Sequence, residues 1–318
     1  LDKVHFRRLG GRLENAGVGV RVDRHLAEKF KFHNRHLWRE RIDIGEVMVE
    51  QNSPKNHLSD AAPASLINVK STYVLKQGDQ VWLFHPPEYE PNMATHVEVV
   101  YDDGDAAVFC KPGNLVVHAA GLYGKNTFIE IIKKMGFADA APVHRIDRET
   151  SGVLMMARTE AAQQKLIEQF AAHQTHRRYL CVIPGTLPAQ RLESRMVRDR
   201  GDGLRGLASE DDEQGLRMVT HIRPVRTWRD FTELECRLET GRTNQIRIQL
   251  SELGHPLCGD VKYRGPFGAA AMEDTSKAPR LALHAAELGF VHPITNQEQR
   301  FQVPWPGDML QWLSGIRK

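Results

Sequence analysis

The chain has 318 residues, 41% of them hydrophobic and 26% charged, and its formal net charge is +3. This composition is ordinary for a soluble globular protein with room for two domains, and so mild a positive charge neither requires nor excludes a nucleic-acid partner. Apolar runs of strand length exclude membrane-spanning helices, and four scattered cysteines argue against a disulfide framework or a zinc site, so we expect a cytoplasmic protein without a membrane partner.

Residues 1–19 are Gly-rich and aperiodic, and we interpret them as a flexible lead-in that lacks the apolar core of a signal peptide. Two short helices are predicted next, over about 22–30 and 35–42. A strand over 47–49 follows, and residues 72–82 are predicted to form a strand, a tight turn and a second strand.

The basic residues of this first region are concentrated in its helices. Positions 21–42 hold seven Lys or Arg residues against three acids. Basic helices of this kind bind phosphate without reading the base sequence, although a solvated helix pair would carry the same charge.

The order of these elements resembles that of the S4 RNA-binding module. Three signatures match it, Arg-x-Asp-x-x-Leu, Gly-Glu-Val-x-Val and Gly-Asp-x-Val, at 21–26, 45–49 and 78–81. The resemblance implies an S4-like α/β RNA-binding domain over 20–84. Its RNA contacts are expected from four arginines, Arg21, Arg24, Arg35 and Arg39.

Residues 85–95 are rich in proline, which forbids helix and favours an extended path, so we predict a stiff linker. Beyond it we expect a second domain over 96–318. This domain is predicted to open with strands at 97–101 and 106–110, separated by an Asp-Asp-Gly-Asp turn, and a helix at 127–135.

Residues 143–156 hold the densest charged motif, with five ionisable side chains in six positions before an apolar run. A polar turn that leads into a buried strand places charged groups at the rim of a sheet, where loops carry chemistry. A solvated turn before a core strand is the alternative interpretation. In an extended segment Arg145 and Asp147 point to the same side, whereas we interpret Arg148 and Glu149 as solvated charges.

The next predicted elements are a helix that Thr159 caps, a strand over 177–185 and a mobile loop over 199–217. Strands are then predicted over 218–228 and 231–238. In the second of these, apolar residues alternate with charged ones, which predicts a largely antiparallel sheet with one wet face.

Residues 240–250 form a second dense motif, in which Thr243 is predicted to cap a helix that ends at Gly254. This helix is expected to bury Ile246, Leu250 and Leu253. Arg247 would lie at the edge of the buried stripe, from which it can reach inward to a carboxylate. A surface ion pair is the alternative interpretation.

Five motifs together resemble those of the RluA-type pseudouridine synthases, in that family's order and at its approximate spacing. They are His-Arg-Ile-Asp-Arg-Glu-Thr-Ser-Gly at 144–152, Arg-Tyr-Leu at 178–180, Thr-Gly-Arg-Thr-Asn-Gln-Ile-Arg at 240–247, Gly-His-Pro-Leu-Cys-Gly-Asp at 254–260 and Leu-His-Ala at 283–285. The resemblance covers about 97–304 and implies an α+β pseudouridine synthase fold, with a mostly antiparallel mixed sheet, a central RNA-binding cleft and flanking helices.

The resemblance also implies roles for four residues. Asp147 would be the catalytic aspartate, and Arg247 would pair with it and keep it ionised at neutral pH. Arg145 would enter the RNA stack in place of the flipped base, and Tyr179 would stack on the target uracil. Converting uridine to pseudouridine breaks and re-forms a glycosidic bond without redox change, so we expect no cofactor and no metal. Asp147 could act as nucleophile or as base at the sugar.

Two positions depart from the family's usual Arg-Thr-His-Gln-Ile-Arg-Val-His form, because Asn244 and Gln249 replace its histidines. Neither is a proposed catalytic group, so we expect activity to survive, with the change felt in RNA contacts or local packing.

We therefore interpret the chain as a monomeric RNA pseudouridine synthase acting on structured RNA. The S4-like domain favours large-subunit ribosomal RNA over transfer RNA. Two alternatives remain open. One is a non-catalytic RNA-binding or ribosome-assembly protein that retains the fold. The other is a nucleosidase or glycosidase, which would use two cooperating carboxylates.

Overall fold

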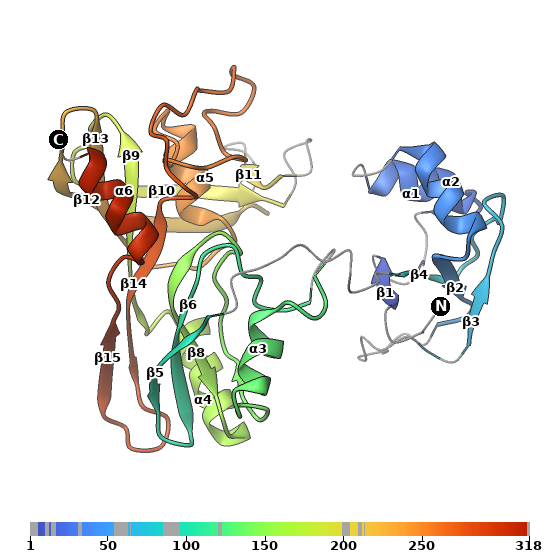
Figure 1. The fold of residues 1–318 in the computed structure, drawn as a ribbon, viewed down its shortest axis with the longest axis horizontal. Helices are drawn as coiled ribbons and strands as arrows, with labels where there is room; N and C mark the ends of the chain where they lie inside the picture. The colour runs from blue at the N-terminus through green and yellow to red at the C-terminus, as the bar shows by residue number, and fades with distance from the viewer. Residues whose placement is uncertain are drawn as a thin grey trace. The chain divides into compact units, whose positions relative to one another are not determined.

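A computed structural model describes residues 6–9, 13, 17–30, 34–53, 63, 65–84, 96–119, 123–198, 204–208, 212 and 214–316. Within the chain, backbone contacts define two compact units (Figure 1). The smaller comprises Leu1–Pro91 with Ala119–Lys125, and the larger comprises Asn92–His118 with Asn126–Lys318. The linker predicted over 85–95 lies outside the described residues.

The smaller unit packs two helices on a four-stranded antiparallel sheet (Figure 1). Its elements are β1 (Phe6–Leu9), α1 (Val22–Lys29), α2 (Arg35–Asp43), β2 (Val47–Glu50), β3 (Leu66–Asn68) and β4 (Gln80–Phe84), and the strand order is β1-β4-β2-β3. Leu26 and Trp38 from the helices are fully buried against Val49 of the sheet. Burial of this apolar surface is what holds the short helices in place, since helices of eight or nine residues are marginal in isolation.

Two predictions for this unit were wrong. Strand β1 lies inside the segment interpreted as a lead-in, where it pairs with β4 so that Phe6 faces Phe84. The sequence Phe-Arg-Arg-Leu of β1 does not alternate between apolar and polar residues, and the partner strand is distant in sequence, so no local pattern marks β1. The strand predicted at 72–75 is also not formed: Val74 makes a single bridge to Arg21, and the additional strand is β3 instead.

In its described residues, the larger unit is built on one eleven-stranded sheet with four helices (Figure 1). Its strands are β5 (Glu98–Asp102), β6 (Ala106–Lys111), β7 (Ala141–Pro142), β8 (Ser151–Ala157), β9 (His176–Pro184), β10 (Gln190–Val197), β11 (Gly206–Leu207), β12 (Leu216–Thr227), β13 (Phe231–Leu238), β14 (Leu283–Val291) and β15 (Glu298–Gln302). Its helices are α3 (Phe128–Lys134), α4 (Glu160–Ala171), α5 (Gln245–Glu252) and α6 (Gly307–Ile316).

The strand order is β11-β10-β12-β13-β9-β14-β8-β6-β5, with β15 on β14 and β7 on β8. Among the described strands, β14 and β8 form the one parallel pair, and the other pairs are antiparallel. The predicted α+β fold with a mostly antiparallel mixed sheet is thereby confirmed.

Helices α3 and α4 pack on opposite faces of the β6–β8 part of the sheet, because successive strand residues point to opposite sides. Phe109 of β6 contacts the cluster that contains Phe128 of α3, whereas its neighbour Val108 belongs to the cluster that contains Leu166 of α4. Both helices begin as predicted, at a threonine whose side chain accepts a backbone N–H of the first turn, Thr127 for α3 and Thr159 for α4.

Helix α5 differs from the prediction because it is enclosed on nearly all sides. Every residue from Gln245 to Ser251 is buried. The residue before the helix is Asn244, in the left-handed region at φ 59°, rather than a capping Thr243. Leu253 is 46% exposed, although Ile246 and Leu250 are buried as expected, and the chain turns away at Gly254 with φ +78°.

Two further expectations for the larger unit were wrong, and one of its strands was not predicted. The outer face of β13 is not wet: Glu233 and Glu235 are 5% and 3% exposed. Trp305 donates its indole N–H to Glu233 at 2.7 Å, so the C-terminal segment covers this face. The predicted loop 199–217 contains β11 and the start of β12 in its described part, and strand β10 was not predicted.

Among the described residues, no helix is long and apolar enough to span a membrane.

Candidate active site

A cavity of about 480 Å³ opens beside the charged motif that precedes β8. Its wall combines that motif with the end of α4, the start of β9 and the turn before α5. Three of the four residues singled out in the sequence, Arg145, Asp147 and Tyr179, line it. Arg247 does not line the cavity; it is 1% exposed and reaches Asp147 from within the protein.

Asp147 is a largely buried carboxylate with a cation behind it. Its side chain is 18% exposed, and Arg247 Nη1 lies 3.9 Å from its Oδ2. Burial raises the pKa of Asp147, and the charges of Arg247, Arg145 and Lys111 oppose that rise, whereas Glu149 adds to it. The net result is a pKa above the usual value for aspartate, so burial outweighs the neighbouring cations, which limit the rise.

Arg247 is shared among several partners, and its closest carboxylate is Asp260 rather than the predicted Asp147. Its Nε and Nη2 donate to the two oxygens of Asp260 at 2.7 and 2.8 Å, the bidentate geometry of a strong ion pair. Nη1 donates to Asn244 Oδ1 at 3.2 Å and lies 3.5 Å from Glu149 Oε2. The guanidinium also lies over the ring of Tyr263, with 5.0 Å between the guanidinium carbon and the ring centroid. Because every part of the guanidinium is held, its position relative to Asp147 is fixed.

Glu149 belongs to this network, so its interpretation as a solvated charge was wrong. It is 8% exposed and lies 2.9 Å from Arg148, 3.5 Å from Arg247 and 3.7 Å from Lys262. Burial disfavours its charge, but Arg247, Lys262 and Arg148 together hold the pKa of Glu149 below its usual value. The alternation that puts Arg145 and Asp147 on one side extends to Glu149 and could have identified it.

Lys111, at the end of β6, was also missed by the sequence analysis. The side chain is fully buried, and Nζ donates to the carbonyls of Pro112 and Leu115 at 2.8 Å and of Arg148 at 3.1 Å. Burial lowers the pKa of Lys111 to about 7, while Asp147 and Glu149 act to raise it. An ammonium has three donors for these three carbonyls, so Lys111 ties the loop that carries Asp147 to the neighbouring strand.

His144 and Gly152 hold the two ends of the motif. Burial lowers the pKa of His144 to about 3, so its neutral Nε2 accepts the N–H of Met155 at 3.0 Å, and its ring stacks on Phe170 with centroids 4.4 Å apart. Gly152 has φ +118°, and a Cβ there would lie 2.1 Å from the carbonyl oxygen of Ala285. The parallel approach of β8 and β14 therefore requires glycine at this position.

Tyr179 stands on β9 with its ring at the cavity wall, packed beside the cluster that contains Ile146. Burial raises the pKa of Tyr179 to about 12, so the phenol keeps its proton at neutral pH. Arg145 is exposed and also lines the cavity, so its cationic side chain lies at the cavity rim.

The two departures from the family motif have distinct surroundings. Asn244 bridges the site, because its Oδ1 accepts from Arg247 and its Nδ2 donates to the Tyr263 hydroxyl at 3.1 Å. Gln249 is buried away from the cavity, where it accepts from Thr220 at 2.6 Å and donates to Ser194 at 3.1 Å. Asn244 therefore touches the ionic network, whereas Gln249 joins α5 to β10 and β12.

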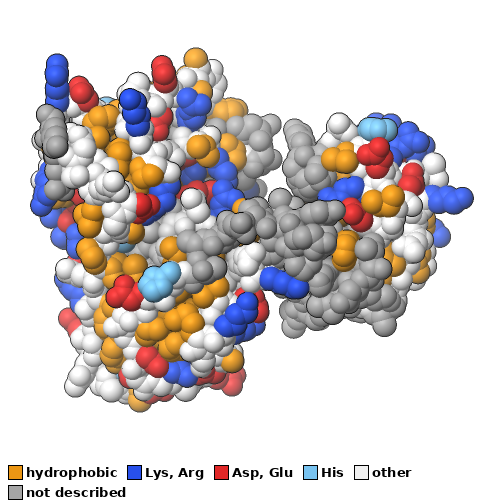
Figure 2. Space-filling model, viewed as in Figure 1, with side chains coloured by type: hydrophobic (Ala, Val, Ile, Leu, Met, Phe, Trp, Pro, Cys, Tyr) orange, Lys and Arg blue, Asp and Glu red, His pale blue; other side chains and the backbone are white. Residues whose placement is uncertain are grey.

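The four arginines singled out in the smaller unit differ in their pairing. Arg21 and Arg35 both lie 3.0 Å from Asp23, which is fully buried, and Arg24 lies 2.8 Å from Glu28. Arg39 is exposed. Basic side chains are visible on the surface of this unit with acidic ones among them (Figure 2). The Arg21–Asp23–Arg35 cluster joins the starts of the two helices, so part of the predicted RNA-binding signature has a structural use.

Comparison with known proteins finds sequence similarity over most of the length of this chain. A family described as RNA pseudouridylate synthase matches residues 105–252. Ribosomal large subunit pseudouridine synthase D of Xylella fastidiosa is 32% identical over 96% of this chain and 91% of its own length, and the protein of that name from Zymomonas mobilis is 34% identical over 92% of each. The solved structure of human RNA pseudouridylate synthase domain containing 1 superposes with a TM-score of 0.56 at 22% identity, covering 68% of this chain and 86% of that one.

Proposed function

The chain belongs to the RNA pseudouridylate synthase family, and from this we propose that it isomerises uridine to pseudouridine in large-subunit ribosomal RNA with Asp147 as its catalytic carboxylate. The observation that carries the assignment is the position of Asp147. It lies at the wall of a cavity that also exposes Tyr179 and Arg145, with Arg247 fixed 3.9 Å behind it. The ribosomal target is supported by the names of relatives that align over nearly the whole chain.

The proposed reaction requires the uridine to leave its stack, because a base inside a helix cannot be reached. Flipping costs a few kcal/mol. Arg145, exposed at the rim, is the side chain that would fill the vacated position. The ring of Tyr179 would stack on the flipped uracil and contribute roughly 1–3 kcal/mol. Tyr179 serves as a surface rather than as an acid or base, since burial raises the pKa of its hydroxyl to about 12.

Asp147 would then act on the sugar, as nucleophile at C1′ or as base at the ribose, and either role needs the ionised form. Arg247 supports that form, and the bidentate bond to Asp260 keeps Arg247 from moving toward the substrate. The C1′–N1 glycosidic bond is cleaved, the uracil rotates, and a C1′–C5 bond forms; C5 loses its proton, and N1 takes up a proton in exchange with solvent. The bonds broken and formed balance without an oxidant, a reductant or a second substrate.

The release of the C5 proton gives a direct test. RNA labelled with tritium at C5 of uracil should lose label to solvent when incubated with the protein. Asp147→Asn should reduce that release roughly 10⁴-fold or more, the usual effect of removing a nucleophile or base. Asp139→Asn is a matched control, because this aspartate is 46% exposed and pairs with Arg158 on the surface. Undiminished release by Asp147→Asn would refute the assignment.

We further propose that residues 20–84 are an S4-like RNA-binding domain, that 85–95 is a linker and that 96–318 is the catalytic domain. Two helices followed by strands, and a contact boundary near the proline-rich segment, support this division. Arg39→Gln should weaken binding of ribosomal RNA without changing tritium release at saturating RNA, since Arg39 is exposed and far in sequence from the motifs. Unchanged binding would count against the module.

We also propose that the protein acts as a monomer in the cytoplasm. The cytoplasmic location is supported by the names of the relatives, which refer to the large ribosomal subunit. Light scattering of the purified chain should give the mass of one copy, about 36.1 kDa.

A further inference from the structure

Arg177 is a buried cation for which no carboxylate partner is found among the described residues. Its side chain is 9% exposed, its Nε makes no hydrogen bond, and its Nη2 donates to the backbone carbonyl of Glu239 at 3.3 Å. Burial lowers the pKa of Arg177, which expresses the cost of keeping this charge out of water. A buried guanidinium is stable when it is paired, so the missing partner points to a ligand.

The position of Arg177 directs it to the cavity of the active site. It stands on β9 two residues before Tyr179, and side chains two apart on a strand share a face. Both line the cavity together with Asp147. Gly241 makes room for the guanidinium, since a Cβ at that position would lie 2.3 Å from Arg177 Nη1.

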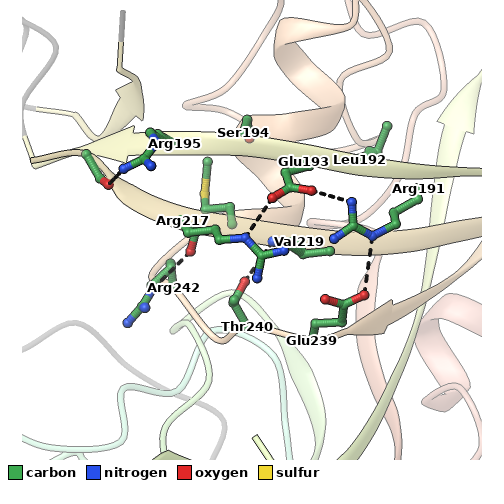
Figure 3. A network of polar contacts seen from close by, with 12 residues as sticks. Arg191, Leu192, Glu193, Ser194, Arg195, Arg217, Val219, Glu239, Thr240 and Arg242 are labelled. Atoms are coloured by element: carbon green, nitrogen blue, oxygen red, sulfur yellow. Dashed lines mark hydrogen bonds and ion pairs between the residues drawn. The ribbon is translucent and has the colours of Figure 1, made fainter. Parts of the chain in front are cut away.

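Glu193 and Glu239, two carboxylates in the polar network that contains Arg242, are already engaged (Figure 3). Glu193 lies between Arg191 and Arg217, with 2.6 Å from Arg217 Nε to the carboxylate. Glu239 offers Arg177 only its backbone carbonyl, because its carboxylate lies 3.4 Å from Arg191 Nε and 2.6 Å from His221 Nε2. Neither acid is therefore available to neutralise Arg177.

A second arginine extends the positive wall. Arg242 also lines the cavity, and its Nε donates to the carbonyl of Arg217 at 3.3 Å rather than to a carboxylate (Figure 3). The positive charges also act on His173, which lines the same cavity. Burial lowers the pKa of His173, and the charges of Arg177, Arg242 and Arg217 lower it further. The cavity thus has a carboxylate on one wall and uncompensated guanidinium groups on another.

We propose that Arg177 and Arg242 form a phosphate-binding subsite that holds a backbone phosphate of the RNA beside the target nucleotide. This inference rests on the proposed function, because it takes the occupant of the cavity to be a nucleotide whose ribose faces Asp147. A guanidinium fits a phosphate through parallel N–H donors, and the two guanidinium groups that line the cavity, those of Arg177 and Arg242, would supply them. A phosphate bound here would fix the ribose against Asp147 while the base rotates.

The test is the salt dependence of RNA binding, measured with an unmodified transcript of large-subunit ribosomal RNA. The proteins carry Asp147→Asn, so that bound RNA is not converted. Arg177→Gln should weaken binding roughly tenfold to a hundredfold. It should also lower the slope of log K against log salt by about 0.7 to 0.9, the value for one phosphate contact. Arg177→Lys keeps the positive charge and should therefore keep most of the slope. If Arg177 mattered only for packing, the slopes of Arg177→Lys and Arg177→Gln would be similar.

Two further variants make the outcome decisive. Arg300→Gln is the matched control, because Arg300 is 59% exposed on β15 and pairs with Glu287. Its slope of log K against log salt should equal that of the protein that carries Asp147→Asn alone. Arg242→Gln, at a partly exposed position, should lower the slope even if Arg177→Gln fails to fold. Folded Arg177→Gln or Arg242→Gln protein with the parental slope overturns the subsite. Failure of the otherwise native chain to release tritium overturns the proposed function instead, whatever the slopes are.

Discussion

The ionic pair behind Asp147 gives the sharpest mechanistic prediction. Removing Arg247 alone would leave Asp260, which is fully buried, as an unpaired charge and would cost roughly 3–5 kcal/mol of stability. The double variant Arg247→Gln, Asp260→Asn removes both charges while keeping hydrogen-bonding groups of similar size. The fold should therefore survive, and Asp147 loses its closest cation.

The size of the effect follows from the geometry. Two unit charges 3.9 Å apart attract by about 4 kcal/mol at an effective dielectric constant of about 20. Loss of this attraction makes Asp147 harder to ionise, so the pKa of Asp147 rises and the acid limb of the kcat/KM profile moves to higher pH. Below that limb the rate is proportional to the ionised fraction, and it should fall by less than about a thousandfold, because the variant also removes the Asp260 charge, which disfavours ionisation of Asp147. At alkaline pH most of the rate should return.

Tritium release measured from pH 5 to pH 9 tests this account. Arg41→Gln with Glu46→Gln is the matched control, because that pair is also largely buried, with 2.6 Å between Nε and Oε2, but lies in the smaller unit. Its acid limb should coincide with that of the unaltered protein. A loss of rate in the Arg247 and Asp260 variant that is equal at every pH would show that Arg247 does not act through the ionisation of Asp147.

Three other predictions concern the same network. Glu149→Gln should move the acid limb to lower pH, since the Glu149 carboxylate raises the pKa of Asp147; an upward movement would contradict the network. Lys111→Met should lower the free energy of unfolding in urea by roughly 3–6 kcal/mol, because three buried carbonyls lose their donor. A loss below about 1 kcal/mol would mean that water replaces the ammonium. Gly152→Ala should cost more than about 3 kcal/mol, whereas Gly136→Ala, with φ +100° and open space around it, should cost about 1 kcal/mol; equal costs would rule out the close contact with Ala285.

The sequence predicts those parts of the structure that rest on local signals. Thr127 and Thr159 mark the helices that they cap, and the charged motif before β8 predicts a loop at the rim of a sheet. Family motifs direct attention to Asp147, Tyr179 and Arg247. The tertiary structure brings Asp147 and Tyr179 to one cavity and places Arg247 behind Asp147, and the order of the family motifs anticipates that the three lie together.

The missed features depend on partners that are remote in the chain. From the sequence alone Glu149 is interpreted as a solvated charge, because its partners Arg247 and Lys262 lie about a hundred residues away in the chain. Lys111 belongs to no recognisable sequence motif, because its three hydrogen-bond acceptors are backbone carbonyls, which every residue has. The face of β13 reads as wet because Glu233 and Glu235 are acidic, yet Trp305 covers the first. Charge alone does not predict exposure when paired cations and a covering segment are supplied from elsewhere.

The most direct test of the central claim is a map of pseudouridine in large-subunit ribosomal RNA from cells that lack this chain and are complemented with either the unaltered protein or Asp147→Asn. The account predicts that one or more sites are lost on deletion, return with the unaltered protein and stay absent with Asp147→Asn at equal expression. Full restoration by Asp147→Asn, or a map unchanged by deletion, would contradict it.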